Sequence, residues 1–292
     1  MSKEFKSFFK TVEGNEGERC HYPTRLDTYG CGCAHDCEHC YAKSLLDFRG
    51  LWHPNDPAVA NISKIRRTIK NRLKEGDVVR LGGMTDCFQP AERRHRVTLE
   101  TIKALNEARV GYLIVTKSDL VAEYGEVMDR DLAHIQVSIT TTDDSLSRRV
   151  ERGAPLPHRR IACVERLQEE GFDVSVRLSP FVPRFVDMDV INSIKCDKVL
   201  VEFLRVNTWI RRWLESVDPD FDFTPYCVKR GGYLHLPLEA KVMYLDRVKG
   251  FKEVSVCEDV ATHQEYWRRN VNANKNDCCN LRNALVKTNG NG

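Results

Sequence analysis

The C-x3-C-x2-C spacing of Cys33, Cys37 and Cys40 constrains this chain more than any other feature. Three thiolates on one short loop can bind three irons of a [4Fe-4S] cluster, and the missing fourth ligand leaves one iron open to a small molecule. An iron that can bind a small molecule indicates a catalytic cluster and not a purely structural one. We therefore predict that these three cysteines are the metal ligands of a catalytic iron-sulfur cluster.

These cysteines have two other conceivable uses, a zinc site and a disulfide framework. A structural zinc site usually has paired C-x2-4-C knuckles well separated in sequence, and here Cys31 would have to be the fourth ligand within the same loop. A non-catalytic zinc-binding module therefore stays open as an alternative function. A disulfide framework is disfavoured because 292 residues can form a large core without cross-links and because a secretory signal is not evident. We expect Cys31 to be a spare thiol near the cluster.

Composition indicates an ordinary globular chain, with 41% hydrophobic and 30% charged residues and a net charge of +3. The first twenty residues are polar with short apolar patches, so the sequence predicts a cytoplasmic protein with no membrane partner. The charge is too small to argue for nucleic acid by itself. The basic clusters are candidates for phosphate contacts or, more often, solvated helix faces: Arg93-Arg94-His95-Arg96, Arg148-Arg149 and His158-Arg159-Arg160.

After the cysteine loop, short apolar runs alternate with amphipathic helical patterns, which is typical of parallel strands joined by crossover helices. The strand candidates cover residues 78–81, 112–115, 135–139, 174–178 and 198–203, with a poorly marked first strand near 25–29. Six strands predict an α/β fold, a partial (β/α)6 barrel with chemistry at the C-terminal strand ends. The alternation fades near Leu204, so we predict a barrel domain over 1–204 and a C-terminal α/β extension over 205–292.

The run from Gly32 to Ala42 resembles the cluster loop of radical S-adenosylmethionine (SAM) enzymes. The resemblance implies that the open iron binds the methionine end of SAM and reduces SAM to a 5′-deoxyadenosyl radical. Gly82, Gly83 and Thr85 follow the second strand and look like the stretch that binds the SAM amino group. The glycines allow a close approach of backbone to ligand.

A narrower resemblance, to the spore photoproduct lyase-like family, rests on four further stretches. They are Thr85-Asp86-Cys87-Phe88-Gln89-Pro90-Ala91-Glu92, Val115-Thr116-Lys117-Ser118, Val137-Ser138-Ile139-Thr140-Thr141 and Leu178-Ser179-Pro180-Phe181-Val182-Pro183. By this resemblance Lys117 binds the SAM carboxylate and Ser138 contacts SAM. The resemblance also implies a one-electron donor such as flavodoxin or ferredoxin.

The chain departs from the repair enzyme of that family at its hydrogen donor. Gly83 stands where the lyase has a donor cysteine, and Cys87 is a candidate substitute. The relay tyrosine that follows the last cluster cysteine in that family is retained as Tyr41. The aromatic residue that precedes the same cysteine in that family is replaced by His39, which we place among the cofactor-binding residues. Thymine-dimer repair is therefore disfavoured, whereas radical chemistry is not.

A second group of cysteines, Cys257, Cys278 and Cys279, is a candidate for a second iron-sulfur cluster, completed by Cys227, His263 or a substrate atom. The alternative is buried free thiols, which behave as small hydrophobes. We predict a radical SAM enzyme that abstracts hydrogen from a nucleobase in DNA or from a nucleotide, for modification, isomerisation or repair. Radical modification of a peptide or small metabolite, with an auxiliary cluster, is the alternative.

Overall fold

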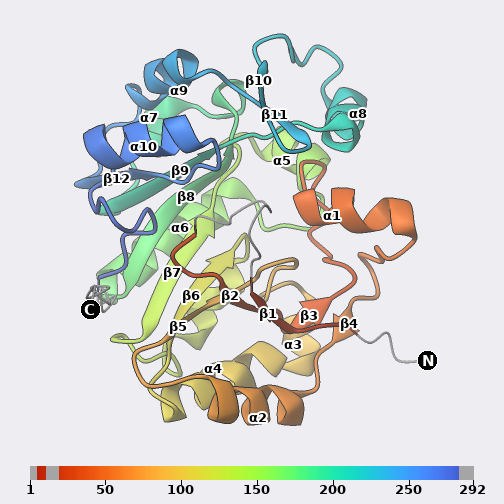
Figure 1. The fold of residues 1–292 in the computed structure, drawn as a ribbon, viewed down its shortest axis with the longest axis vertical. Coiled ribbons are helices and arrows are strands. Elements are labelled where there is room, and N and C mark those ends of the chain that lie inside the picture. The colour runs from red at the N-terminus through yellow and green to blue at the C-terminus, as the bar shows by residue number, and fades with distance from the viewer. Residues whose placement is uncertain (1–4, 11–19, 283–292) are drawn as a thin grey trace.

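The computed structural model describes residues 5–10 and 20–282. Its centre is an eight-stranded sheet in the order β1-β2-β5-β6-β7-β8-β9-β12 (Figure 1). Neighbouring strands from β2 to β12 pair in parallel, whereas β1 pairs antiparallel with β2. The strands of this sheet are β1 Phe8–Lys10, β2 Thr24–Leu26, β5 Val78–Leu81, β6 Gly111–Thr116, β7 Ala133–Ser138, β8 Asp173–Phe181, β9 Lys198–Phe203 and β12 Glu253–Val256.

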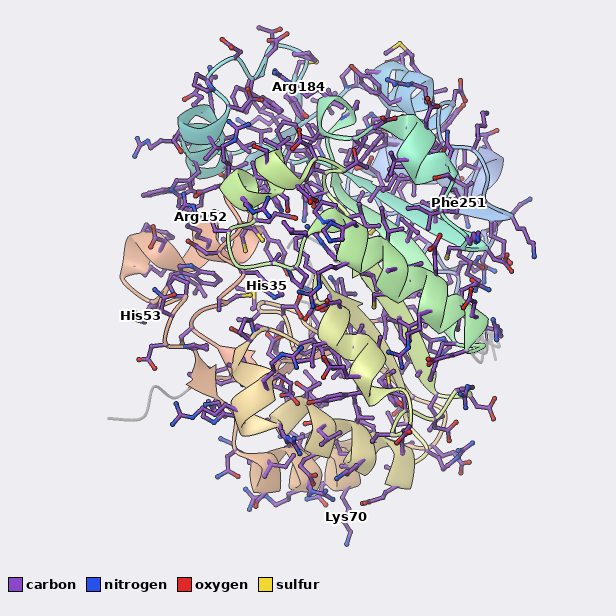
Figure 2. The ribbon with its side chains drawn as sticks, turned by 180° about the vertical axis from the view of Figure 1, so that it is seen from behind. His35, His53, Lys70, Arg152, Arg184 and Phe251 are labelled. Carbon is purple, nitrogen blue, oxygen red and sulfur yellow. The ribbon has the colours of Figure 1, made fainter. Side chains whose placement is uncertain are left out.

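Crossover helices join the parallel strands and lie over one face of the sheet, as Figure 2 shows from behind for α6. The helices are α1 Tyr41–Leu46, α2 Ile62–Arg72, α3 Ala91–His95, α4 Val97–Glu107, α5 Asp144–Val150, α6 Pro157–Glu169, α7 Met188–Asn192, α8 Thr208–Val217, α9 Leu238–Leu245 and α10 Ala261–Asn270, with 3-10 turns η1 Asp47–Arg49, η2 Asp119–Tyr124 and η3 Pro183–Phe185. The predicted partial barrel is confirmed, because β2, β5, β6, β7, β8 and β9 form the expected parallel series.

The poorly marked first strand is split. β2 joins the main sheet, whereas β3 (Tyr29–Gly30) leaves it to pair with β4 (Ala58–Val59). The predicted extension supplies β12, which pairs in parallel with β9 and so continues the barrel sheet. It also supplies α8 and the hairpin of β10 (Val228–Arg230) with β11 (Tyr233–His235), at the top of Figure 1. The boundary at residue 204 stays a prediction.

The two faces of the sheet differ in chemistry. The outer face is apolar and forms the main core with the helices, through residues such as Val79, Ile135 and Val201. The inner face carries polar side chains, among them Arg177, which donates a 2.6 Å hydrogen bond to Gln136. The interior of the barrel, called the chamber below, is therefore lined by polar side chains beside a small apolar cluster that includes Tyr22, Leu113 and Leu281.

The segment 277–282 closes the N-terminal end of this chamber. Asp173, at the start of β8, accepts hydrogen bonds from Lys198 Nζ at 2.8 Å and from the Arg282 backbone N–H at 2.8 Å. Asp173 Oδ2 also lies 2.6 Å from His134 Nδ1 on the neighbouring strand β7. Lys198 in turn donates to the Asn280 carbonyl at 2.7 Å. A bilayer-spanning helix would need a long apolar run, and none of the helices within the described ranges has one.

Candidate active site

The cysteine loop lies between β3 and α1, with Cys33 and Cys37 buried and Cys40 half-buried at the N-terminus of α1. Two backbone turns shape it: Asp36 N–H donates to the Cys33 carbonyl at 3.0 Å and Cys40 N–H to the Cys37 carbonyl at 3.2 Å. Burial raises the pKa of all three thiols. Without a metal the thiols are neutral, and a metal must supply the charge that favours the thiolates.

Two neighbouring segments fix the loop. The Gln89 side chain accepts a hydrogen bond from Ala34 N–H at 3.0 Å and donates to the Gly32 carbonyl at 3.3 Å. On the other side, Gly153 N–H donates to the His35 carbonyl at 3.1 Å. A Cβ at Gly153 would lie 1.8 Å from the Ala34 carbonyl oxygen, so only glycine allows this approach. The loop is thus held from both sides independently of any metal.

The surroundings of the loop fit an iron-sulfur cluster. Trp52 packs with Cys33 and Cys40, and its Nε1–H is buried without a hydrogen-bond partner among the described residues. His35 Nε2, inside the loop, is also buried and has no hydrogen-bond partner among the described residues. Buried donors normally have partners, and cluster sulfurs accept hydrogen bonds. Cys33, Cys37 and Cys40 would hold the cluster, with these two donors beside it.

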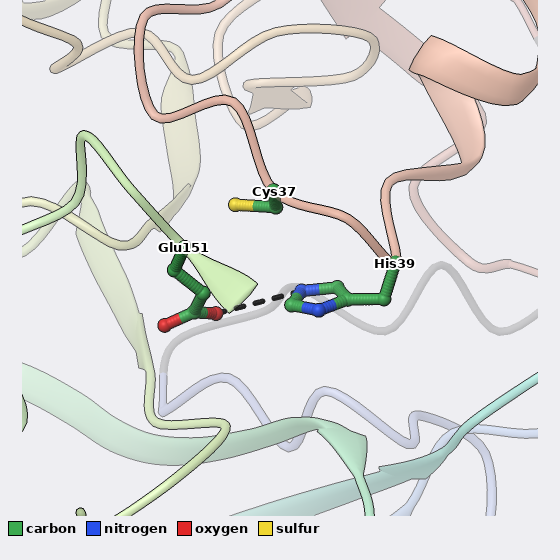
Figure 3. Close-up of side chains that lie close together, drawn as sticks. All are labelled: Cys37, His39 and Glu151. Carbon is green, nitrogen blue, oxygen red and sulfur yellow. Dashed lines mark ion pairs between the residues drawn. The ribbon is translucent and has the colours of Figure 1, made fainter. Parts of the chain in front are cut away.

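A buried ion-pair network lies next to Cys37 (Figure 3). Glu151 is fully buried, with Oε2 2.5 Å from Arg160 Nη2 and Oε1 3.3 Å from Lys117 Nζ. His39 Nε2 lies 3.4 Å from the same Oε1. Burial alone would raise the pKa of Glu151, but the positive charges of Arg160 and Lys117 outweigh it and hold that pKa well below its usual range. Burial lowers the pKa of His39 to about 3, so its imidazole is neutral.

Lys117 therefore has a defined position at the C-terminal end of β6. Its ammonium also donates to the Ser179 carbonyl at 3.0 Å and to Thr140 Oγ1 at 3.3 Å. Asp86 holds the Lys117 backbone N–H at 2.7 Å. An ammonium group in this place, next to the cysteine loop and partly solvated, can bind a carboxylate of a ligand.

The glycine turn after β5 is pinned by a carboxylate that the sequence did not indicate. Asp27 accepts hydrogen bonds from Gly83 N–H at 2.6 Å and Met84 N–H at 2.9 Å, and burial raises its pKa to about 6. Tyr41 donates its hydroxyl hydrogen to the Gly83 carbonyl. Gly82 has φ +83°, and its Cβ would lie 2.8 Å from the Val115 carbonyl. The backbone of this turn therefore lies against the first turn of α1, where Tyr41 begins the helix.

Three other predicted residues are placed as follows. Thr85 Oγ1 donates to the Tyr29 carbonyl at 2.6 Å, so this hydroxyl fixes the turn. Ser138 is buried at the end of β7, and its carbonyl accepts from Arg160 Nη1 at 2.8 Å. Cys87 is fully buried in the main hydrophobic core. That packing does not favour the hydrogen-donor role, which stays a prediction.

One expectation is wrong. Arg160, grouped with candidates for phosphate contacts, is fully buried on Glu151 and cannot reach a phosphate at the surface. Sequence reasoning also missed Glu151, Asp27 and the role of Gln89. Gln89 lies inside a motif that the sequence singled out, whereas the partners of the two carboxylates come together only in the fold.

A family model described as the radical SAM superfamily matches residues 28–196, more than half of the chain. The chain belongs to the radical SAM superfamily. Membership makes it a radical SAM enzyme with a [4Fe-4S] cluster and SAM as cofactors, and it sets aside the zinc-module alternative. No reaction type follows from the match.

Two uncharacterized proteins match about half of this chain. An uncharacterized protein of Mycobacterium tuberculosis is 28% identical over an alignment of 167 residues, with 53% of this chain and 49% of that protein covered. An uncharacterized protein of Methanocaldococcus jannaschii is 26% identical over 164 residues, covering 55% of this chain and 61% of that protein. The chain thus spans about half the length of the mycobacterial relative.

Solved structures confirm the fold. A spore photoproduct lyase mutant with bound AdoMet and dinucleoside spore photoproduct has a TM-score of 0.61 at 14% identity, covering 84% of this chain and 78% of that one. Streptococcus suis SuiB bound to S-adenosylmethionine has a TM-score of 0.51 at 14% identity, covering 84% of this chain and 52% of that one. At these identities the likeness concerns architecture.

Proposed function

We propose that this enzyme cleaves SAM reductively at the Cys33, Cys37 and Cys40 loop and abstracts hydrogen from a nucleobase in a nucleic acid or nucleotide. A bound cluster would supply the electron that splits SAM into methionine and a 5′-deoxyadenosyl radical. The electron would come from a small donor protein such as flavodoxin or ferredoxin. The protein residues position SAM and substrate and exclude water.

The polar groups around the loop suit the amino acid end of SAM. Lys117 would exchange its Thr140 and Ser179 contacts for the SAM carboxylate, while Glu151 keeps its shorter contact with Arg160. The Gly82 and Gly83 turn would receive the amino group, with Tyr41 holding the turn through the Gly83 carbonyl. These assignments rest on the family resemblance and agree with the placement of each side chain.

An aromatic and cationic surface carries the substrate proposal. Phe48 stacks on Trp209 with ring centroids 6.2 Å apart, and Trp209 lies 5.9 Å from Trp213. Arg49 lies 4.9 Å from the Phe48 ring and Arg212 5.6 Å from the Trp209 ring. Aromatic rings stack on bases and arginines pair with phosphates, so alternation of the two is typical of single-strand binding surfaces.

This surface lies at the same end of the barrel as the cysteine loop. α1 follows the loop directly and α8 follows β9, and Asn207 Nδ2 donates to Ser44 Oγ at 3.3 Å to join them. Phe48 is 53% exposed. The solved lyase that shares this fold binds a dinucleoside, which supports the same substrate class here. Because Gly83 replaces the donor cysteine, we propose base modification or isomerisation in place of dimer repair.

The test is SAM cleavage by anaerobically reconstituted, reduced protein with single-stranded DNA, duplex DNA, nucleotides or peptides. We expect nucleic acid or nucleotide to raise 5′-deoxyadenosine formation, and deuterium from a labelled base to appear in that product. A double variant, Phe48→Ala with Trp209→Ala, should weaken single-strand binding by about 1 to 3 kcal/mol per lost stack without changing basal SAM cleavage. Met243→Ala, at an exposed apolar residue on α9, is the control. Stimulation by peptides alone would overturn the nucleobase proposal.

A further inference from the structure

Four cysteines from three distant segments meet inside the barrel. Cys20, Cys278 and Cys279 pack in one cluster with Tyr22, and this cluster rests on the inner face of β6. The thiol of Cys278 lies close to those of Cys257 and Cys279, and Cys257 follows β12 directly. The structure brings the three cysteines of the predicted second site close together, and a fourth thiol that the sequence did not indicate, Cys20, lies beside them.

We propose that Cys20, Cys257, Cys278 and Cys279 bind a second [4Fe-4S] cluster with all four irons ligated. Cys20 takes the place of the fourth ligand, for which the sequence offered Cys227, His263 or a substrate atom. Cys227 is exposed before β10, and His263 Nδ1 lies 3.2 Å from Lys241 Nζ in a separate buried pair.

The backbone around these cysteines is fixed without a metal. Tyr22 donates a 2.6 Å hydrogen bond to Asp277 Oδ2, and the Cys279 N–H donates to Asp277 Oδ1 at 2.9 Å. On the other side, the Cys257 N–H donates to the Val201 carbonyl at 2.9 Å. The segment that carries Cys20 and the segment that carries Cys279 are therefore tied to each other through one carboxylate. Ligands held in this way need little reordering to bind a cluster.

Buried donors without partners surround the thiols. Among the described residues, Arg80 Nε, Gln136 Nε2 and Ser255 Oγ are buried and have no hydrogen-bond partner. Ser255 is two residues before Cys257 on the same side of β12, and Gln136 is in register with Val115, which packs against the cysteine cluster. Buried donors without partners are rare in a folded protein. Sulfides and thiolates of a cluster would accept these hydrogen bonds.

Positive charge also faces the group. The Arg80 guanidinium interacts with Cys20 and Cys279, and the Arg177 guanidinium interacts with Cys257 and Cys279. Glu202 offsets part of the Arg177 charge, because the two side chains are paired. Four thiolates on a cluster carry net negative charge, which buried arginines stabilise. Arg177 already has protein partners in Gln136 and Glu202, so the charge of these arginines supports the cluster beside the packing of the thiols and does not by itself require it.

The spacing of the thiols favours a cluster over a single zinc ion. Zinc with sulfur ligands at about 2.3 Å places the sulfurs about 3.8 Å apart in a tetrahedron. In the described parts of the chain, only Cys37, His39 and Glu151 form a group of three such side chains whose ligand atoms all lie within 4.8 Å. No three of the four described cysteines meet that limit, so they do not form the compact set of ligands that a single zinc ion needs.

The experiment uses the full chain, reconstituted anaerobically with iron and sulfide, and counts both elements. Cys33, Cys37 and Cys40 are changed together to Ala, which removes the first cluster. We expect about eight irons in the unmodified protein and about four in the triple variant, with an electron paramagnetic resonance signal after dithionite reduction. Further change of Cys278 and Cys279 to Ala should remove the rest. Changing Cys163 and Cys196, which are buried elsewhere, is the matched control.

The triple variant alone decides the question if the larger variant fails to fold. Retention of about four irons and their signal supports the second site, and Cys20→Ser should weaken that signal. A triple variant with no iron, or with zinc in its place, overturns the proposal. Iron, sulfide and spectra need neither SAM nor substrate, so this result is independent of the proposed nucleobase function.

Discussion

The two cysteine groups of this enzyme are built in opposite ways. Cys33, Cys37 and Cys40 lie on one loop of eight residues, whereas the second group runs from Cys20 to Cys279. The first is surrounded by fixed ion pairs around Glu151 and opens toward the proposed SAM site. The second is closed by Tyr22 and Leu281 on the inner face of the sheet. Ligands on one short loop that opens toward charged side chains suit a site where a small molecule binds and leaves. Ligands from distant segments, enclosed by other side chains, suit a cofactor that stays bound.

The largest effect should come from removing the buried cation beside the first group. Arg160→Met leaves Glu151 buried with Lys117 and neutral His39 as its remaining partners. Breaking a buried pair from one side costs about 3 to 5 kcal/mol, so we expect a loss of that size in the free energy of unfolding, measured by denaturant titration. Arg166→Met, in an exposed pair with Glu170 on the same helix, should change stability little. Equal effects of the two changes would show that the Glu151 network is not what stabilises this end of the barrel.

The next effect concerns the closed end of the barrel and depends on pH. Burial would raise the pKa of Asp173, but hydrogen bonds from His134, Arg282 N–H and Lys198 hold it well below its usual range. A carboxyl with a depressed pKa stabilises the fold above its unfolded pKa of about 4, and this stabilisation is lost as pH falls below that value. Asp173→Asn should therefore lower stability by about 2 to 3 kcal/mol at pH 7 and by less near pH 3.

Thermal and denaturant unfolding at the two pH values measure this difference. Asp197→Asn, at a half-exposed carboxylate paired with Lys252, is the control and should show little loss at either pH. A loss that is the same at pH 7 and pH 3 would mean that the charge of Asp173 does not stabilise the closed end.

The smallest effect should be on SAM affinity at the open end. Lys117→Ala removes one charge-assisted contact to the proposed carboxylate, which is worth about 1.5 kcal/mol or roughly tenfold in Kd. Equilibrium binding of SAM to the reconstituted protein measures it, and the iron content should not change. Lys103→Ala, an exposed lysine paired with Glu100, is the control. If the Lys117 variant bound SAM with unchanged affinity, the SAM carboxylate would have to be bound by another residue.

The difference between the two groups also explains what the sequence could predict. The apolar runs at 78–81 and 198–203 predicted their strands because both faces of a parallel sheet are covered, and the short spacing of the cluster cysteines is visible as a motif. Cys20 has no such signal, because it is an isolated thiol in a polar segment, and its neighbours are more than 230 residues away. Glu151 and Asp27 were missed for the same reason. The roles of Tyr41, Lys117 and Ser138 came from resemblance and stay predictions.

The closing of the barrel by residues 277–282 has a consequence for the order in which the protein matures. The ligands of the first site leave the ribosome together, long before the sheet is finished, so an assembly machinery can meet them as a short exposed loop. The second set is complete only after Cys278 and Cys279 have been synthesised, and the Tyr22 to Asp277 hydrogen bond then ties that segment across the chamber. Loading of the second site would therefore compete with the last step of folding, and a chain that closes first would trap four empty thiols inside.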